Sequence, residues 1–483
     1  MFETLLMIDN RDVQAPGGAT FERHNPMDGT VATRAAAGTV TDANAAVEAA
    51  RAAWPAWAAL GPTARRALLL KAGDALAARR GEFVATMAQE TGSAGAWAGF
   101  NVQLAAGMLR EAAALTTQVA GEVIPSDQPG CVALAVRRPA GVVVGIAPWN
   151  APVILGVRAI ATPLACGNTV VLKASETCPA THRLIGEVMR EAGLPPGVVN
   201  VLTHAPKDAA AIVAALIAHP AVRRINFTGS TRVGRLVAKL AAEHLKPVLL
   251  ELGGKAPLIV LDDADLDAAV AAAAFGAYMN SGQVCMSTER IIVEERIGDA
   301  FMAKFNGKVS TLVAGNPSLG QAPLGSIIDP KAAARIRELI DDAVARGARL
   351  HQAAPADGTL LSAAVLDRVT PSMKIYAEES FGPVTTVVRA ASEAEAIRLA
   401  NDTEYGLSSA VFSRDIARAL RVAEQLETGM CHINGATVHD EAQMPFGGMK
   451  ASGYGRFGGR AGIAEFTDLR WITIATQEAH YPI

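Results

Sequence analysis

The chain has 483 residues, half of them apolar and 19% charged, which excludes a disordered or fibrous protein. The length exceeds the roughly 100–200 residues usual for one domain, so we expect two or three domains. With 44 basic and 47 acidic side chains the formal net charge is −3. A chain of this charge has no general attraction to nucleic acid or to an anionic membrane. These values favour a soluble globular enzyme or binding protein.

Two uncharged stretches, 139–157 and 268–288, are long enough on paper to cross a membrane, but prolines or polar residues interrupt both. We therefore interpret them as buried core or as the lining of a site. The first twelve residues carry Glu3 and Asp9 in place of the basic and apolar regions of a signal peptide. The expected location is the cytoplasm.

The five cysteines are odd in number and widely separated, and no two of them have the spacing of a metal site. This pattern predicts neither a disulfide framework nor bound zinc. Most of them are expected to be small buried side chains. The cysteines are Cys131, Cys166, Cys178, Cys285 and Cys431.

The first part of the chain is predicted to be mainly helical. Residues 42–80 have the spacing of two helices, the first capped near Thr41–Asp42, and 83–115 is predicted as one long helix. A turn at 127–130 precedes residues 131–138, where apolar and polar side chains alternate as in a half-exposed strand. This strand is expected to form one arm of a hairpin.

The middle of the chain alternates short β-branched runs with helical stretches, which predicts a doubly wound parallel sheet. The runs are Gly141–Ile146, Thr169–Lys173, Val198–Leu202 and Arg224–Phe227. A second series indicates another α/β unit after about residue 253. Its runs are Pro257–Leu261, Arg290–Val293, Thr385–Val388 and Ser409–Phe412. Ligands bind beyond the carboxyl ends of such strands, so the residues that follow each run are the candidates for a site.

The segment Phe227–Gly234 ends one of these strands and opens a helix. Its glycines and hydroxyl residues suit a phosphate held by free backbone N–H groups, although they would equally serve as an ordinary helix cap. Arg235 and Leu236 occupy the places where a P-loop needs Lys and Ser or Thr. The segment therefore disfavours hydrolysis of a nucleoside triphosphate.

Lys173 and Glu176 follow another apolar strand. A lysine at this place can bind ribose hydroxyls, and a carboxylate can accept from the adenosine 2′-hydroxyl while repelling a 2′-phosphate. The pair thus favours NAD over NADP. A solvated strand end remains the alternative explanation.

Cys285 and Glu251 are the candidates for covalent and acid–base chemistry. The thiol lies in an uncharged stretch of Gly, Gln and Ser residues, which packing alone explains badly. Glu251 stands between an apolar run and a Gly-Gly pair, where burial should raise its pKa and suit it to take a proton from water near neutral pH.

Together these segments resemble the NAD(P)-dependent aldehyde dehydrogenase superfamily over essentially the whole chain. Six blocks occur in the family order, and such a series is highly specific. The blocks are Ala147–Asn150, Phe227–Ser230, Leu250–Lys255, Gly282–Cys285, Glu379–Pro383 and Pro445–Gly448. The resemblance implies a Rossmann-type NAD domain, an α/β catalytic domain and a small β arm for oligomerisation.

The resemblance also implies roles for individual residues. Cys285 would be the nucleophile, Asn150 and the Cys285 backbone N–H would hold the oxyanion, and Glu251 would activate the hydrolytic water. Glu379 and Phe381 would position the nicotinamide riboside. The residues expected to bind the cofactor are Ile146, Ala147, Pro148, Trp149, Lys173, Ser175, Glu176, Phe227, Gly229, Ser230, Val233, Gly234, Leu252, Glu379 and Phe381.

Several positions bear on the substrate. Arg158 stands where many relatives carry Lys, and Ala151 where many carry an aromatic residue, which leaves room for a bulky, planar substrate. Val284 and Met286 flank the nucleophile and are expected to line the same pocket. Arg158 and the stretch 202–206 resemble the branch that acts on salicylaldehyde, vanillin or benzaldehyde. Two further aromatic residues, Trp97 and Tyr454, are expected to pack in the core.

The domain boundaries implied are an NAD-binding domain at 1–120 and 140–253, a catalytic domain at 254–452, and an arm at 121–139 and 468–483, with 453–467 returning to the first domain. The partners expected are a small aldehyde and further copies of the chain, as a homodimer or homotetramer, with no nucleic acid, membrane or metal. Two alternatives stay open: a Cys/Glu thioester hydrolase without redox chemistry, and a dehydrogenase of aliphatic or semialdehyde substrates.

Overall fold

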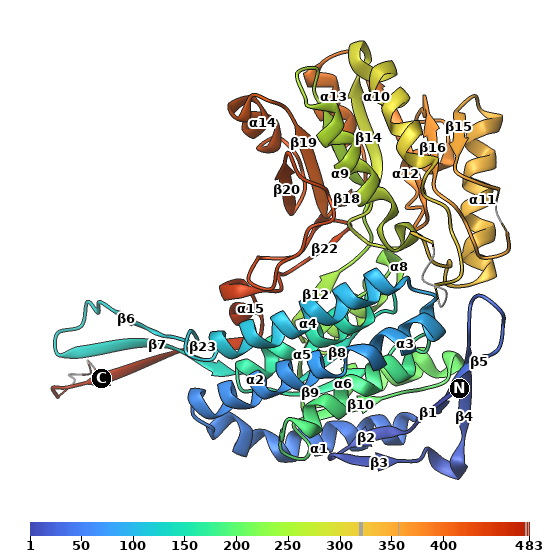
Figure 1. Cartoon of the computed structure of the whole chain (residues 1–483). Helices are drawn as coiled ribbons and strands as arrows, with labels where there is room; N and C mark the ends of the chain where they lie inside the picture. Colours follow the sequence, from blue (N-terminus) through green and yellow to red (C-terminus); the bar gives the residue numbers. More distant parts are fainter. Residues whose placement is uncertain (318–321, 356, 479–480, 482) are drawn as a thin grey trace.

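The computed structural model describes residues 1–317, 322–355, 357–478, 481 and 483, which form two α/β lobes and a projecting β arm (Figure 1). The first lobe is built on an eight-stranded sheet. In spatial order its strands are β22 (Gly453–Tyr454), β12 (Val248–Glu251), β11 (Val222–Thr228), β8 (Val142–Ile146), β9 (Thr169–Lys173), β10 (Val199–Leu202), β2 (Leu6–Ile8) and β3 (Arg11–Val13). The five central strands, β12 to β10 in this order, are parallel.

The strand order reverses beside β8. From β8 the chain continues to β9 and β10 on one side, and then returns to β11 and β12 on the other. Two connections therefore leave the sheet in opposite directions at the carboxyl ends of β8 and β11, which opens a crevice between them. The loops after β8, β9 and β11 all lie at this edge.

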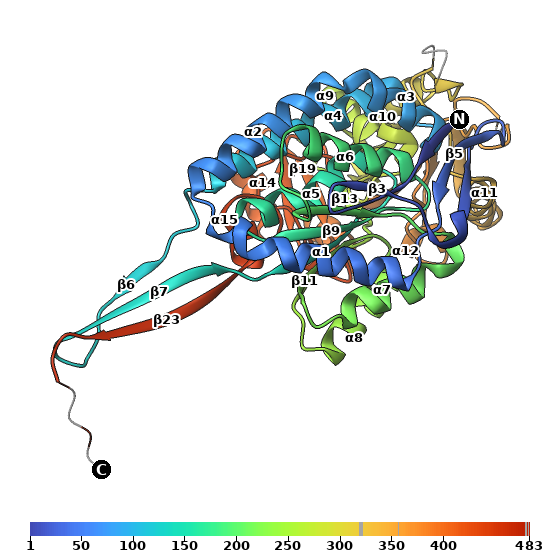
Figure 2. The same cartoon turned by 90° about the horizontal axis from the view of Figure 1, so that it is seen from below.

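Helices cover both faces of this sheet. On one face α5 and α6 contact the strands and α2, α3 and α4 pack outside them; α1, α7 and α8 cover the other face (Figure 2). Their bounds are α1 Val40–Ala59, α2 Pro62–Ala78, α3 Arg80–Thr91, α4 Gly95–Leu115, α5 Pro152–Ala165, α6 Pro179–Glu191, α7 Ala209–Ala218 and α8 Thr231–Glu243. All fourteen residues of α5 are buried, because the helix lies between the sheet and the outer helices.

Two details of the helical region differ from the sequence-based expectations. The long helix predicted at 83–115 is two helices, because Gly92 adopts a left-handed conformation with φ of 67° and ends α3. The cap of α1 is Thr39 rather than Thr41–Asp42. Asp42 is instead the third helical residue, and its carboxylate accepts from the Thr39 backbone N–H at 2.7 Å in a capping box.

The second lobe is built on a seven-stranded sheet that is parallel except at β15. In spatial order its strands are β15 (Arg349–Gln352), β16 (Ala364–Asp367), β17 (Val384–Ala390), β14 (Thr288–Glu294), β13 (Ala256–Val260), β19 (Ser408–Phe412) and β20 (Met430–Ile433). Helices again cover both faces. They are α9 Leu266–Tyr278, α10 Glu295–Val309, α11 Pro330–Ala345, α12 Lys374–Ala377, α13 Glu393–Asn401 and α14 Ile416–Ala423.

The four residues 252–255 join the last strand of the first sheet, β12, to the first strand of the second, β13. After the second lobe the chain returns through β22 to the edge of the first sheet, where Gly453 and Tyr454 pair antiparallel with β12. Helix α15 (Gly459–Glu465) then packs against α4 and α5. Residues 252–255 and the return of the chain through β22 therefore connect the two lobes beside the crevice.

The arm is a three-stranded antiparallel sheet of β6 (Glu122–Ile124), β7 (Cys131–Pro139) and β23 (Thr467–Ala475), which extends away from both lobes (Figure 2). β7 is the centre strand and pairs with β23 over nine residues. The strand predicted at 131–138 is confirmed. Of the C-terminal arm segment 468–483, residues 479–480 and 482 lie outside the described structure.

The strand runs predicted from the sequence are all observed, with ends that differ by up to two residues. Strands that the sequence analysis did not predict are mostly short or at sheet edges. They include β1 (Phe2–Thr4), β4 (Thr20–His24), β5 (Val31–Ala36), β18 (Tyr405–Gly406) and β21 (Met449–Lys450). None of the described helices combines the length and the apolar character needed to cross a membrane.

Candidate active site

A cavity of about 610 Å³ lies in the crevice at the carboxyl ends of β8, β9 and β11. Its walls are mostly apolar. Eleven of the fifteen residues expected to bind a cofactor line it: Ile146, Ala147, Pro148, Trp149, Lys173, Ser175, Glu176, Phe227, Gly229, Ser230 and Val233. Gly234, Leu252, Glu379 and Phe381 lie outside this set.

Lys173 and Glu176 form an ion pair where the end of β9 borders this cavity. The Lys173 ammonium lies 3.4 Å from Glu176, and Lys173 is buried. Burial opposes ionisation of Glu176, but the charge of Lys173 holds the pKa of this carboxylate below its ordinary value. His204 packs nearby, where burial and the same ammonium lower its pKa to about 4. Glu176 is therefore a charged acceptor on the cavity wall.

Helix α8 presents its N-terminus to the same cavity. The Ser230 hydroxyl accepts from the Val233 backbone N–H at 3.4 Å, while the first N–H groups of a helix have no partner inside it. Gly234, in the first turns of α8, packs closely against Leu252: a Cβ at this position would lie 2.4 Å from a Leu252 methyl carbon. An apolar crevice with an ion pair and a helix N-terminus at its wall has the donor and acceptor groups that a dinucleotide needs. These residues fit NAD(P).

The nucleophile candidate Cys285 lies on a tightly held loop before β14. The short helix η3 (Met279–Gly282) bends through three successive left-handed residues, and the Gln283 side chain then bonds the backbone at Ser326 and Ile328. Gly254 passes so close to this loop that a Cβ there would lie 2.2 Å from the Cys285 carbonyl oxygen. Cys285 is partly exposed and faces a second cavity.

Glu251 ends β12 directly before this contact. Its carboxylate is buried and neither oxygen has a hydrogen bond of normal geometry within the described chain. Burial raises the pKa of Glu251 to about 7, although the nearby Cys285 thiol and Arg158 oppose the shift. The raised pKa expected from the sequence is confirmed. Burial also raises the pKa of the Cys285 thiol well above its usual value, and the Glu251 charge adds to this.

Asn150 connects the loop after β8 to the loop of the thiol. Its side-chain amide donates to the Gln283 carbonyl at 3.0 Å, and its own carbonyl accepts from Trp97 and Asn280, each at 2.9 Å. An amide nitrogen carries two N–H groups, so the second one remains for a ligand beside Cys285.

Glu379 and Phe381 are half-buried and belong to a separate network beside the crevice. Glu379 accepts from the Gly254 backbone N–H at 2.9 Å, and burial raises its pKa to about 8. Phe381 meets Trp149 edge-on at 5.8 Å between ring centroids. Glu289, paired with buried Lys255 at 2.7 Å, accepts the backbone N–H groups of Ser380 and Phe381 and fixes this turn.

The second cavity, of about 360 Å³, has Cys285 in its wall. The loop after β8 borders both cavities: Ala147–Trp149 line the first, and Asn150 and Ala151 line the second. All four residues expected in the substrate pocket, Ala151, Arg158, Val284 and Met286, line it. The remaining lining is largely apolar and includes Trp97, Phe100, Ile154, Leu155, Phe275, Met279, Val438 and Phe446.

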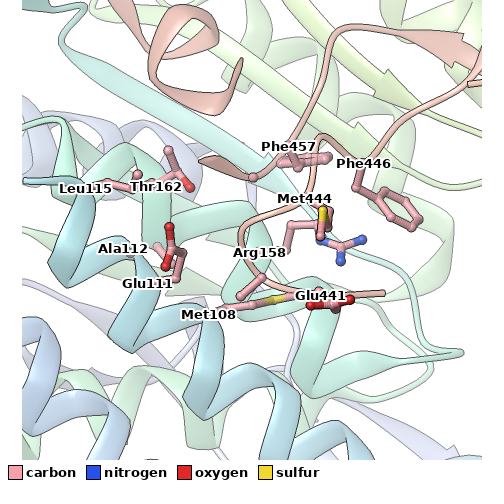
Figure 3. A pocket seen from close by; sticks show the side chains of 13 residues that line it. Met108, Glu111, Ala112, Leu115, Arg158, Thr162, Glu441, Met444, Phe446 and Phe457 are labelled. Atoms are coloured by element: carbon pink, nitrogen blue, oxygen red, sulfur yellow. The ribbon is translucent and has the colours of Figure 1, made fainter. Parts of the chain in front are cut away.

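Arg158 and Asp440 form a buried ion pair in the wall of the second cavity, with side-chain exposures of only 6% and 8%. The Arg158 guanidinium also lies over the Phe446 ring, 4.1 Å from its centroid, and extends toward it in Figure 3. Arg158 borders a smaller pocket on its other side, with Met444, Phe457 and Glu441 (Figure 3). The sequence analysis did not predict Asp440, because no motif marks it.

Of the two aromatic residues expected in the core, only Trp97 is buried. It also lines the second cavity. For Tyr454 the expectation was wrong: it lies in the short edge strand β22 and is 52% exposed. An edge strand has a neighbouring strand on one side only, and the sequence did not reveal that β22 lies at the edge of its sheet.

Comparison with known proteins agrees with this geometry. The model of the aldehyde dehydrogenase family matches residues 13–472. The chain is 62% identical to a vanillin dehydrogenase of Pseudomonas fluorescens over the full length of both, and 51% identical to a salicylaldehyde dehydrogenase of Pseudomonas sp. strain C18 over 99% of this chain and 100% of the relative. The crystal structure of a salicylaldehyde dehydrogenase from Pseudomonas putida G7 complexed with salicylaldehyde superposes with a TM-score of 0.98, at 50% identity and full coverage of both chains.

Proposed function

Since the chain belongs to the aldehyde dehydrogenase family, we propose that it oxidises aromatic aldehydes to carboxylates with NAD as the hydride acceptor. One observation carries this proposal. The thiol of Cys285 stands in the wall of a largely apolar cavity, and the loop at Trp149–Asn150 separates that cavity from the crevice that fits a dinucleotide. A substrate carbon bound to sulfur would therefore lie beside the cofactor.

In the first half of the reaction, the Cys285 thiolate attacks the aldehyde carbon, and the carbonyl π electrons move to oxygen as the sulfur–carbon bond forms. The free N–H of Asn150 and the Cys285 backbone N–H hold the oxyanion. NAD held by the residues that line the crevice would supply the acceptor for the hydride on this carbon.

In the second half, Glu251 takes a proton from water, which attacks the thioester carbon; the carbon–sulfur bond breaks and releases the carboxylate. A base works best when its pKa lies near the working pH, and burial gives Glu251 a pKa of about 7. Within the described part of the chain neither Glu251 oxygen has a hydrogen-bond partner, so a water molecule does not have to compete for the carboxylate.

The shape of the second cavity supports an aromatic substrate. Ala151 contributes only a methyl group, while Trp97 and Phe446 supply flat apolar walls. The relatives named for vanillin and salicylaldehyde share 62% and 51% of their residues with this chain. A semialdehyde would need a free cation for its distal carboxylate, but Arg158 already pairs with Asp440.

The preference for NAD over NADP rests on Glu176. Its charged carboxylate lies on the crevice wall, next to Lys173, where it can accept from a ribose 2′-hydroxyl. A 2′-phosphate would meet a like charge at the same place.

We also propose that the chain associates with further copies of itself through the arm, as a homodimer or homotetramer. β23 presents apolar side chains to solvent, with Leu469 62% and Trp471 76% exposed, and Val123 of β6 is 75% exposed. β23 is also the outermost strand of its sheet, so its free edge can pair with another strand.

The activity itself is testable with a substrate panel. Benzaldehyde, vanillin, salicylaldehyde and hexanal, each supplied with NAD, should give NADH absorbance at 340 nm, with kcat/KM highest for an aromatic member. Activity on hexanal alone would contradict an aromatic preference. Hydrolysis of an activated ester without NADH formation from any aldehyde would leave only the hydrolase.

Glu251→Gln should stall the second half of the reaction. Rapid mixing with benzaldehyde and NAD is expected to show a burst of about one NADH per site, followed by turnover at least 100-fold slower than in the wild type. The matched control Cys285→Ala should give no burst. In the wild type, the hydrolytic step should accelerate as the pH rises through about 7, because Glu251 acts in its deprotonated form. An unchanged steady-state rate in Glu251→Gln would show that another group is the base.

Glu176→Ser should shift the cofactor preference toward NADP. Removing the carboxylate leaves the Lys173 charge to attract a 2′-phosphate, so the ratio of kcat/KM for NAD over NADP should fall at least ten-fold. Glu191→Ser, at an exposed carboxylate ending α6, is the control and should leave the ratio unchanged. The same ratio in both variants would remove Glu176 from cofactor recognition.

Leu469→Lys with Trp471→Lys should weaken self-association, because two charges replace exposed apolar side chains of β23. Light scattering should show a smaller mass than for the wild type at equal concentration. Arg470→Gln, on the opposite face of the same strand, should leave the mass unchanged. A monomeric wild type would refute the arm as an interface.

A further inference from the structure

Asp440 has hydrogen-bonding capacity that the protein does not use. Its Oδ2 atom accepts from the Arg158 guanidinium, whereas Oδ1 is buried and has no partner within the described chain. A carboxylate can accept about four hydrogen bonds. A buried acceptor without a hydrogen-bond partner raises the free energy of the folded protein. We therefore expect a donor from outside the protein to bind it.

The second cavity offers a direction from which a donor can reach Asp440. Asp440 lines the second cavity together with Cys285, and its side chain is more than nine-tenths buried. The neighbouring lining residues Val438, Phe446 and Met286 carry no side-chain N–H or O–H that could donate.

Besides Arg158, three side chains of the lining carry an N–H: Trp97, His439 and Asn150, whose amide donates to the Gln283 carbonyl at 3.0 Å. The Trp97 indole donates to the Asn150 carbonyl at 2.9 Å, and the His439 ring bonds the Glu441 carboxylate at 2.9 Å. None of these bonds reaches Asp440 Oδ1, which leaves it an acceptor for a molecule that fills the cavity.

The Arg158 charge keeps this acceptor strong. Arg158 is anchored on two sides, by Asp440 and by the ring of Phe446 at 4.1 Å, so the carboxylate is held in one place. Glu251 lies within electrostatic reach of both members of the pair. The pair is consequently part of the wall that meets the ring of a substrate attached to Cys285.

We propose that Asp440 accepts a hydrogen bond from a phenolic hydroxyl on the substrate ring, and that the preferred substrates are hydroxybenzaldehydes. This inference rests on the proposed function and adds the determinant of substrate choice. A ring without a hydroxyl leaves the Asp440 oxygen unpaired in a dry site, whereas a hydroxylated ring satisfies it. Sites built to hydrogen-bond a substrate hydroxyl discriminate strongly against analogues that lack it.

The wild-type enzyme provides the first test. The kcat/KM values of 2-, 3- and 4-hydroxybenzaldehyde are compared with those of their methyl ethers and of benzaldehyde, at a pH where the phenols are neutral. At least one hydroxyl position should exceed both its methyl ether and benzaldehyde by ten-fold or more. Equal values at all three positions would overturn the inference, while measurable oxidation of benzaldehyde would still uphold the proposed function.

The second test is Asp440→Asn, scored as a ratio within the same variant so that folding and catalytic losses cancel. The preference for the favoured hydroxybenzaldehyde over benzaldehyde should fall at least ten-fold, because the charged acceptor is gone. Glu441→Gln is the matched control, since Glu441 bonds His439 and Gln443 and does not line this cavity. An equal loss for both substrates would make Asp440 a support for Arg158 only, and would refute the proposal.

If Asp440→Asn is inactive, equilibrium binding tests the proposal without catalysis. In a Cys285→Ala background, calorimetry with the favoured hydroxybenzaldehyde and with benzaldehyde should show the preference when Asp440 is present and its loss when Asp440→Asn is added. Ionising the phenol should also abolish the preference, because a phenolate cannot donate and is repelled by the carboxylate. Tighter binding of the phenolate would assign the contact to Arg158 and overturn the role of Asp440.

Discussion

The arrangement of the site depends on one close contact between the lobes, where residues 252–254 pass against the loop of Cys285. The chain leaves β12 at Glu251 and needs glycine at Gly254 because a side chain there would collide with the Cys285 carbonyl. This contact brings the buried carboxylate beside the thiol and excludes other polar partners from it. The raised pKa of Glu251 and the raised pKa of Cys285 both follow from the same desolvation.

Two ion pairs give the two cavities different chemistry at their walls. Lys173 and Glu176 lie in the crevice beyond β9, where both can contact a polar ligand. Arg158 and Asp440 lie in an otherwise apolar wall, where the arginine is held against Phe446 and one carboxylate oxygen is left over. A buried pair of this kind contributes little net stability, which favours a role in recognition.

Local patterns predicted much of the framework. β9 begins and ends at the residues expected from the sequence, and the loops after β8, β9 and β11 lie together as the parallel strands required. The prediction failed where a single residue changed the backbone or the environment. Gly92 divided a helix whose apolar spacing continues through it, and Tyr454 is exposed because β22 is an edge strand.

The sequence by itself determined the parallel α/β architecture, the candidate residues Cys285, Glu251 and Asn150, and the expectation of a raised pKa at Glu251. The architecture follows from periodicity, Cys285 and Glu251 from the residue types beside them, and Asn150 from the resemblance of the motifs to the family. Only the tertiary structure decided that Arg158 pairs with Asp440, 282 positions away, and that this pair borders the cavity of the thiol. Burial and charge pairing between distant segments depend on how whole elements pack, and no local pattern records that packing.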